Sequence, residues 1–164
     1  MSQKPDPFVT SPATLPPAGR GSTLIEALAA FALTGLLAVS VLSLLHTAVH
    51  HLRAADRLDR ARGVAETVAA RLDAVSFHRL PGYFGVDDSE QEGLLDTRDG
   101  SAPPEWSELL EPLPDGRIEA RLEGLGAGGA AAALGDAPGC RLRVRVSYLE
   151  AGRRRRVRLI WVRG

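Results

Sequence analysis

An apolar run near the amino terminus constrains this chain more than any other feature. From Leu24 to Leu45 the only charged side chain is Glu26, and no proline interrupts the run. At a rise of 1.5 Å per residue, a helix of this length spans roughly 33 Å, which is enough for the hydrocarbon core of a bilayer. The sequence therefore predicts one membrane-spanning helix, and the remainder of the chain is polar enough to lie in water.

The carboxyl end of the run does not resemble the end of a cleavable secretory signal. The apolar core of such a signal is shorter, and a small-residue cleavage site follows it. Here the run continues into His-Thr-Ala-Val-His over residues 46–50. We therefore interpret the run as an anchor that stays in the membrane.

A specific motif stands at the amino-terminal end of the run. Residues 18–30 read Ala-Gly-Arg-Gly-Ser-Thr-Leu-Ile-Glu-Ala-Leu-Ala-Ala. A polar leader thus ends in Gly21, and Ser22 opens an apolar helix that carries Glu26 as its fifth residue. This arrangement resembles the class III signal of type IV prepilins and pseudopilins.

The resemblance implies how the chain is processed and assembled. A prepilin peptidase cuts between Gly21 and Ser22 and methylates the new amino terminus at Ser22. In the filament, Glu26 of one subunit pairs with the terminal ammonium of its neighbour and sets the axial register. A carboxylate inside a membrane helix costs a few kcal/mol without a partner, so this pairing has a physical reason. The implied partners are the prepilin peptidase, other pilin or pseudopilin subunits, the inner-membrane assembly platform and membrane lipid.

The resemblance implies a structural role rather than an enzymatic one. We expect a minor subunit of a type IV pilus, held in the bacterial inner membrane by a single span, with its carboxyl-terminal head in the periplasm. Minor status is favoured because Ser22 stands where an aromatic residue is usual and because the leader is long. Two alternatives stay open: a minor pseudopilin of a type II secretion system, and a signal-anchored periplasmic binding domain that is never processed.

Basic residues around the span favour the opposite orientation. Those that follow it are Arg53, Arg57, Arg60 and Arg62, and those that precede it are Lys4 and Arg20. Lys and Arg usually stay on the cytoplasmic side of a span, which would place the head in the cytoplasm. We give the motif more weight, because residues 52–76 have the pattern of a continuing helix rather than of a short loop.

Apolar side chains recur at spacings of three and four beyond the membrane, which is the pattern of an amphipathic helix. This stripe comprises Leu58, Ala61, Ala65, Val68, Leu72 and Val75. One helix is therefore expected from about residue 23 to residue 77. The expected divisions are a leader over 1–21, a transmembrane helix over 22–46, an amphipathic helix over 47–78, and a loop-rich region with a sheet over 79–164.

Alternation of apolar and charged residues predicts strands near 118–122, 142–148 and 157–161. A three-residue turn at 150–152 joins the last two strands as a hairpin. Residues 80–116 are rich in proline and are predicted as loop, with at most a short helical turn near 105–110. The predicted fold is therefore α+β: a long amino-terminal helix packed on a small antiparallel sheet of three or four strands, with arginine on its outer face.

Charge is separated along the chain although the formal net charge is zero. Carboxylates dominate from Asp87 to Glu111, and arginines dominate from Arg141 onward. We expect these two segments to face each other or solvent, and a basic binding surface is the alternative. The run Arg153–Arg156 could contact nucleic-acid phosphates. The absence of net positive charge argues against nucleic acid as a partner.

Two groups of residues have some features of a metal site. His46 and His50 lie four apart on one helix face, but Thr47 stands where a zinc protease would have Glu. We interpret these histidines, with His51, as polar residues at the membrane interface. The acidic segments 87–90 and 96–100 fit no calcium loop, because an arginine stands where a ligand is needed. No metal or cofactor is therefore predicted.

The sequence contains no recognisable catalytic set. Cys140 is the only cysteine, so it cannot form an internal disulfide, and we expect it to be a small buried residue. No phosphate-binding loop, nucleophile–base set or pair of catalytic carboxylates is found. We therefore predict that this protein is not an enzyme.

Overall fold

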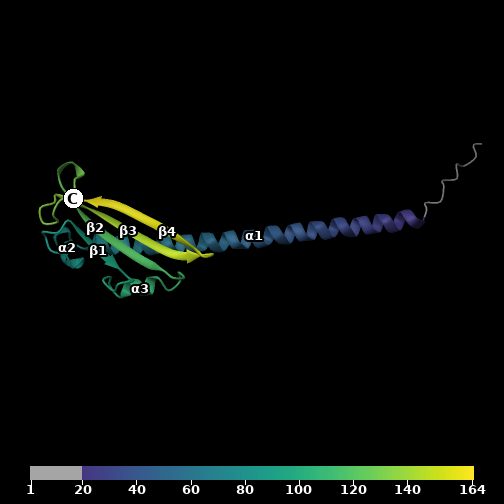
Figure 1. Cartoon of the computed structure of the whole chain (residues 1–164), viewed down its shortest axis with the longest axis horizontal. Helices are drawn as coiled ribbons and strands as arrows, with labels where there is room; N and C mark the ends of the chain where they lie inside the picture. The colour runs from purple at the N-terminus through teal and green to yellow at the C-terminus, as the bar shows by residue number, and fades with distance from the viewer. Residues whose placement is uncertain (1–19) are drawn as a thin grey trace, which may run out of the picture. The chain divides into compact units, whose positions relative to one another are not determined.

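The computed structural model describes residues 20–164, with side chains from Thr23 onward. Most of the predicted leader, residues 1–19, lies outside the described residues. The chain divides into two compact units, Met1–Ala48 and Val49–Gly164. We call the second unit the head, and it holds all four described strands (Figure 1). A long amino-terminal helix and a small antiparallel sheet confirm the predicted α+β class.

Helix α1 spans Arg20–Ala74 and contributes residues to both units. It ends three residues before the position that the sequence pattern predicted. At this end the Arg163 guanidinium donates a hydrogen bond to the Val75 carbonyl at 2.5 Å. The last turn of a helix leaves carbonyls without intrahelical partners, and a basic side chain there is favourable. The last strand thus helps to fix where the helix stops.

The sheet contains four antiparallel strands in the order β1-β2-β3-β4. Their bounds are Glu92–Asp96 for β1, Arg117–Leu125 for β2, Gly139–Glu150 for β3 and Arg153–Arg163 for β4. The last three strands were predicted from alternation. Strand β1 was not, and the prediction of loop over 80–116 is wrong for Glu92–Asp96. This segment is short and is extended through pairing with β2.

The turn between β3 and β4 has two residues, one fewer than predicted. Ala151 and Gly152 both have positive φ, +47° and +74°. Two-residue hairpin turns with positive φ at both positions suit the right-handed twist of the strands that they connect. The turn sets the register, in which Leu142 pairs with Trp161 and Val146 with Val157.

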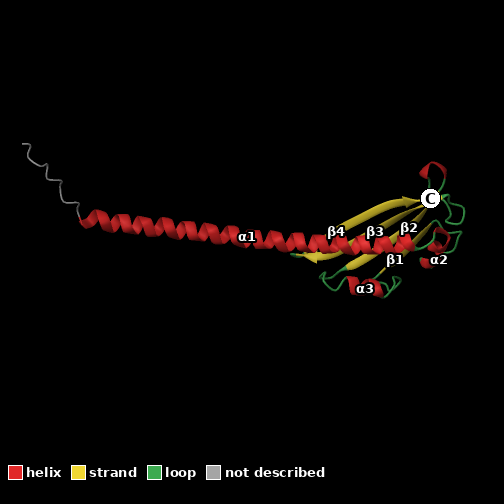
Figure 2. Ribbon diagram, turned by 180° about the vertical axis from the view of Figure 1, so that it is seen from behind, coloured by secondary structure: helices red, strands yellow, loops and turns green. Residues whose placement is uncertain are grey.

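One face of the sheet packs against the part of α1 that belongs to the head (Figure 2). The most deeply buried residues on the two sides are Ala61, Ala65, Val68, Leu72, Ile118, Ala120, Leu122, Leu142, Val144 and Val146. Four positions of the predicted stripe, from Ala61 to Leu72, therefore belong to the core. Leu58 does not, because it is 49% exposed, while Val64 joins the core at 8%. The packed face begins about one turn later than predicted.

Short helices cover the end and edge of this core. They are η1 (Phe77–Arg79), α2 (Leu80–Tyr83), α3 (Glu105–Leu109) and η2 (Ala127–Gly129). Helix α3 confirms the short turn predicted near 105–110. Its Trp106 is completely buried in the core cluster, which explains how a proline-rich segment is held against the head.

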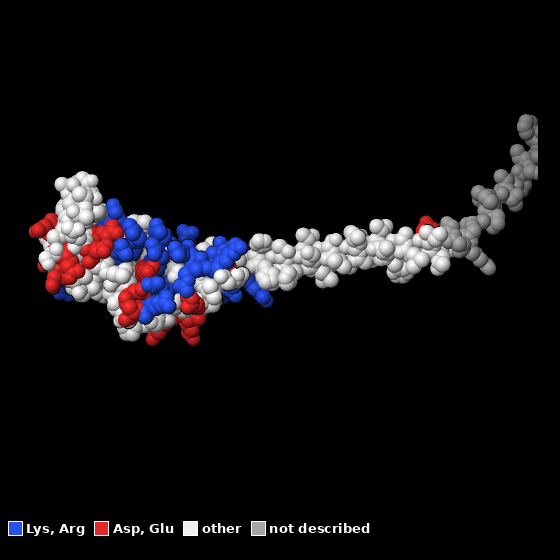
Figure 3. Space-filling view, in the orientation of Figure 1, with Lys and Arg blue, Asp and Glu red and all other residues white. Residues whose placement is uncertain are grey.

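Arginines of β3 lie on the outer face of the sheet, and glutamates of β2 neutralise them. Arg145 pairs with Glu119 at 3.1 Å, and Arg141 and Arg143 pair with Glu123 at 3.2 and 3.4 Å. The separation of charge along the sequence predicted that these arginines face the acidic segment 87–111 or solvent. In the described ion pairs their counter-charge comes instead from the neighbouring strand. Figure 3 shows basic and acidic side chains interleaved on this face of the head.

Candidate functional site

The apolar part of α1 exposes its side chains in this structure. Every residue from Thr23 to Leu52 is exposed, and large side chains such as Phe31 and Leu36 are 77% and 67% exposed. Burying one such side chain is worth about 1.5–3 kcal/mol, so the whole surface disfavours water by tens of kcal/mol. By length and composition this helix could cross a membrane.

Polar hydroxyls within the apolar part are bonded to their own helix. Thr34 donates to the carbonyl of Ala30 and Ser40 to that of Leu36, both at 2.8 Å. Thr47 donates likewise to Ser43 at 2.9 Å. An unsatisfied polar group is costly in hydrocarbon, so these bonds make the segment compatible with a lipid environment.

Glu26 is the one residue of the predicted assembly site whose side chain is described. It is exposed on α1 and takes part in none of the ion pairs of the described residues. The helix begins at Arg20, so the backbone at Gly21 and Ser22 is helical, whereas their side chains lie outside those described. The structure thus leaves this carboxylate available to an external partner.

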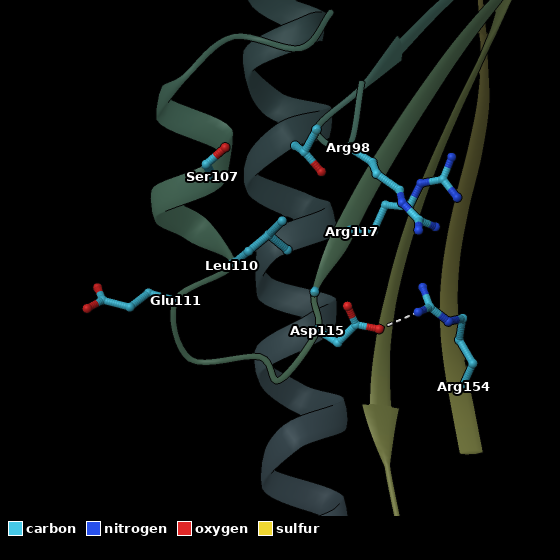
Figure 4. A pocket seen from close by; sticks show the side chains of 9 residues that line it. Arg98, Ser107, Leu110, Glu111, Asp115, Arg117 and Arg154 are labelled. Atoms are coloured by element: carbon cyan, nitrogen blue, oxygen red, sulfur yellow. Dashed lines mark hydrogen bonds and ion pairs between the residues drawn. The ribbon is translucent and has the colours of Figure 1, made fainter. Parts of the chain in front are cut away.

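A cavity of about 360 Å³ opens where the loop after α3 meets β2 and β4 (Figure 4). Its basic residues are mostly neutralised within the head. Arg117 forms ion pairs with Asp96 and with Glu119, and Arg154 pairs with Asp115. The Arg117 guanidinium lowers the pKa of Asp96, and backbone donation from Arg98 acts in the same direction. This arrangement holds the edge of the sheet in place.

The lining of this cavity has little catalytic potential. Ser107 is its only hydroxyl besides Thr97, and no histidine lines it. Glu111 points away from the basic side chains in Figure 4. Of the two carboxylates in the lining, Asp115 is paired with Arg154, and no ion pair of the described residues includes Glu111.

Among residues 23–164, whose side chains the structure describes, no group of three or more His, Cys, Asp or Glu side chains could hold a metal ion. In the segment 96–100, Asp96 is bound to Arg117, and Asp99 accepts the Ser101 N–H at 2.9 Å. Both carboxylates of that segment are therefore committed to contacts within the head.

Cys140 lies on β3 and is 1% exposed, as expected for a small core residue. Burial raises the pKa of its thiol, and the nearby charge of Arg163 offsets part of this effect. A thiol is nucleophilic only as the thiolate, so this cysteine is poorly reactive in the folded head.

A second cavity was not anticipated from the sequence. It measures about 490 Å³ and lies between α1 and the β3–β4 turn. We call it the basic cleft, and the charged or titratable residues that line it are His50, His51, Arg53, Arg57, Glu150, Arg153 and Arg155. The spacing of Arg53 and Arg57 on one helix face was a usable signal. Their proximity to a turn about a hundred residues later was not, since it depends on the packing of the head.

Comparison with family models, curated proteins and solved structures gives no match for this chain. The function must therefore be inferred from the residues and their geometry.

Proposed function

We propose that this protein is a structural subunit of the type IV pilin class, made as a precursor and assembled through its amino-terminal helix. The observation that carries the proposal is Glu26: an exposed carboxylate without a described partner, five residues after Gly21, at the start of an apolar helix surface. In a bilayer such a group costs a few kcal/mol. A terminal ammonium of a neighbouring subunit would offset that cost.

The arrangement of the head supports the same proposal. The helix continues from the apolar segment into a stripe that packs on a four-stranded antiparallel sheet. A helix that is apolar all round at one end and amphipathic at the other suits a subunit with a membrane-held stem and a water-exposed head. The resemblance at the Gly21–Ser22 junction, rather than this geometry, is the reason for proposing a periplasmic head and the role of a minor pilus subunit. A minor pseudopilin of a type II secretion system is the second candidate on the same features.

The mature amino terminus provides the direct test. Mass spectrometry of the protein from its host is expected to find a chain that begins at methylated Ser22. The variant Gly21→Glu should remain uncut, because it changes the residue at the scissile bond. An intact Met1, or a cut beyond residue 45, would instead identify an unprocessed anchor or a secreted domain.

Assembly provides a second test, with a matched control on the same helix. Glu26→Ala is expected to remove the protein from sheared filaments while leaving its level in the membrane unchanged. Glu66→Ala is the control, because Glu66 is also exposed on α1 and its ion pair among the described residues is with Arg62, at 2.9 Å. Equal incorporation of the Glu26→Ala protein and the control would show that Glu26 has no part in assembly.

A further inference from the structure

The basic cleft brings together guanidinium groups from two distant parts of the chain. Arg53 and Arg57 lie one turn apart on α1, and Arg153 and Arg155 lie two apart on β4. Residues four apart share a helix face, and residues two apart share a strand face, so each pair presents its side chains in one direction. Figure 3 shows blue side chains gathered around this end of β4.

Most of these cations have no counter-charge in the head. Arg155 pairs with Glu150 at 3.1 Å, and Glu150 is the only carboxylate in the lining. Arg53, Arg57 and Arg153 take part in none of the ion pairs among the described residues. The arginines of β3, by contrast, are all paired with glutamates of β2. Repulsion between converging cations disfavours the empty cleft and favours an anion within it.

The chemistry of the cleft favours a phosphate group. A guanidinium presents a planar fork of donors that matches phosphate oxygens, and it loses less hydration than an ammonium when it is paired. Several forks around one concavity can hold a phosphate from more than one side. Arginine supplies all four cationic side chains of the lining, and none is lysine.

The position of the cleft along the chain indicates the source of that phosphate. His50 follows Leu45 by five positions on α1, which corresponds to about 8 Å along a helix. The headgroup layer on each side of a bilayer core is roughly 5–8 Å thick, and long arginine side chains reach back toward it. We propose that the basic cleft binds the phosphate of an anionic phospholipid at the membrane surface. This inference rests on the membrane anchorage in the proposed function.

The proposal also accounts for the arginines that follow the span. Counted as a topology signal, they favour a cytoplasmic head. Of the four, Arg60 and Arg62 are paired along the helix with Asp56 and Glu66, each at 2.9 Å. The two that lack such a partner, Arg53 and Arg57, are the two in the cleft. A lipid headgroup would supply the missing charge on either side of the membrane.

The test uses the full chain in nanodiscs that contain equimolar phosphatidylcholine and phosphatidylglycerol. Native mass spectrometry of the released protein counts the lipids that remain bound. We expect the wild type to retain phosphatidylglycerol in preference to phosphatidylcholine. A basic residue near an anionic membrane contributes about 1 kcal/mol, so Arg53→Gln with Arg57→Gln should reduce that preference on the order of 30-fold.

Matched variants separate the cleft from general surface charge. Arg60→Gln with Arg62→Gln removes the same charge from the same helix but from residues outside the cleft, and should reduce the preference far less. Arg153→Gln alone should reduce the preference for phosphatidylglycerol several-fold. This variant tests the strand side of the cleft, because Arg153 lies on β4 and not on α1. An equal loss in the paired-arginine control would overturn the proposal, and so would a wild type without preference.

Two further arms identify the source of the phosphate. Inorganic phosphate or duplex DNA, added at moderate salt, should not displace the bound phosphatidylglycerol. Displacement by either would overturn the assignment to lipid and indicate a soluble anion or nucleic acid. Failure of this inference is separable from failure of the proposed function. A methylated Ser22 terminus without lipid preference rejects only the cleft, and lipid preference in an uncut chain rejects only the pilin assignment.

Discussion

The ion pair between Asp96 and Arg117 offers a quantitative test of the head. Asp96 is 2% exposed on β1, and its carboxylate accepts hydrogen bonds from Arg117 Nε at 2.9 Å and from the Arg98 backbone N–H at 2.9 Å. The change Asp96→Asn keeps the size of the side chain. It removes the charge and turns an amide N–H₂ or a single oxygen toward a guanidinium. The pair, rather than packing, is therefore what this variant perturbs.

The expected cost follows from the contacts that remain. A hydrogen bond to a charged group is worth about 1.5–3 kcal/mol, and breaking a fully buried ion pair costs about 3–5 kcal/mol. Arg117 is 29% exposed and keeps Glu119 at 3.1 Å, so it is not left without a partner. We therefore expect Asp96→Asn to lower the free energy of unfolding by about 2–3 kcal/mol. This corresponds to a fall in Tm of roughly 10 °C for a head of this size.

The stability difference between wild type and Asp96→Asn should depend on pH. The pKa of Asp96 is lowered in the fold, first by the hydrogen bond from Arg117. A carboxyl group of this kind contributes stability above its unfolded pKa of about 3.9, and the contribution is lost as the pH falls through the folded pKa. The difference between wild type and variant should be constant near neutral pH and shrink in acid.

Thermal unfolding of the full chain in neutral detergent can be followed by the fluorescence of buried Trp106. Asp99→Asn is the matched control, because Asp99 is exposed, acts on Arg117 only through a weak charge interaction, and accepts a hydrogen bond from the Ser101 N–H that an Asn oxygen can also accept. The control should leave Tm unchanged. A Tm for Asp96→Asn within 2 °C of wild type, or a difference that persists unchanged at low pH, would refute the reasoning.

Two other predictions test close packing in the head. Gly124→Ala would place a Cβ 2.3 Å from the Ala132 carbonyl oxygen and should lower the free energy of unfolding by about 1–3 kcal/mol. Gly63 has open space around it on α1, so Gly63→Ala should raise the free energy of unfolding by about 0.5–1 kcal/mol. Urea unfolding of both variants measures the difference, and equal stabilities would contradict this prediction. Cys140 should react with maleimide about a hundredfold more slowly in the folded protein than in denaturant, because its side chain is buried and the pKa of its thiol is raised. Rapid labelling of the native chain would contradict this prediction and would mean that the β3–β4 region opens readily.

Helices and strands in which apolar residues recur at a regular spacing were predictable from the sequence. The α1 helix depends on an apolar run and then on a stripe of period 3.6, and both survive in the structure over most of their length. Strands β2, β3 and β4 were predicted from alternation over 118–122, 142–148 and 157–161, and each strand extends beyond its alternating part. Long regular patterns are reliable because many residues contribute to the same choice.

Features that depend on a distant partner were not predictable in this way. The segment Glu92–Asp96 has only five residues and no clear alternation, so its strand exists through pairing with β2. The sequence likewise predicted that the β3 arginines face the acidic segment 87–111 or solvent, whereas glutamates of β2 neutralise them. Register decides this, because it places Glu119 opposite Arg145 and leaves the acidic segment elsewhere.

The same distinction applies to the candidate sites. The sequence by itself determined the apolar helix, its single carboxylate at Glu26 and the Gly21–Ser22 junction, because all three lie within a few residues of one another. Only the tertiary structure decided that Arg57 and Arg153 line one cleft, and that Leu58 stays outside the core. Such proximities arise when a helix packs against a hairpin, and packing depends on the whole head rather than on any local stretch of sequence.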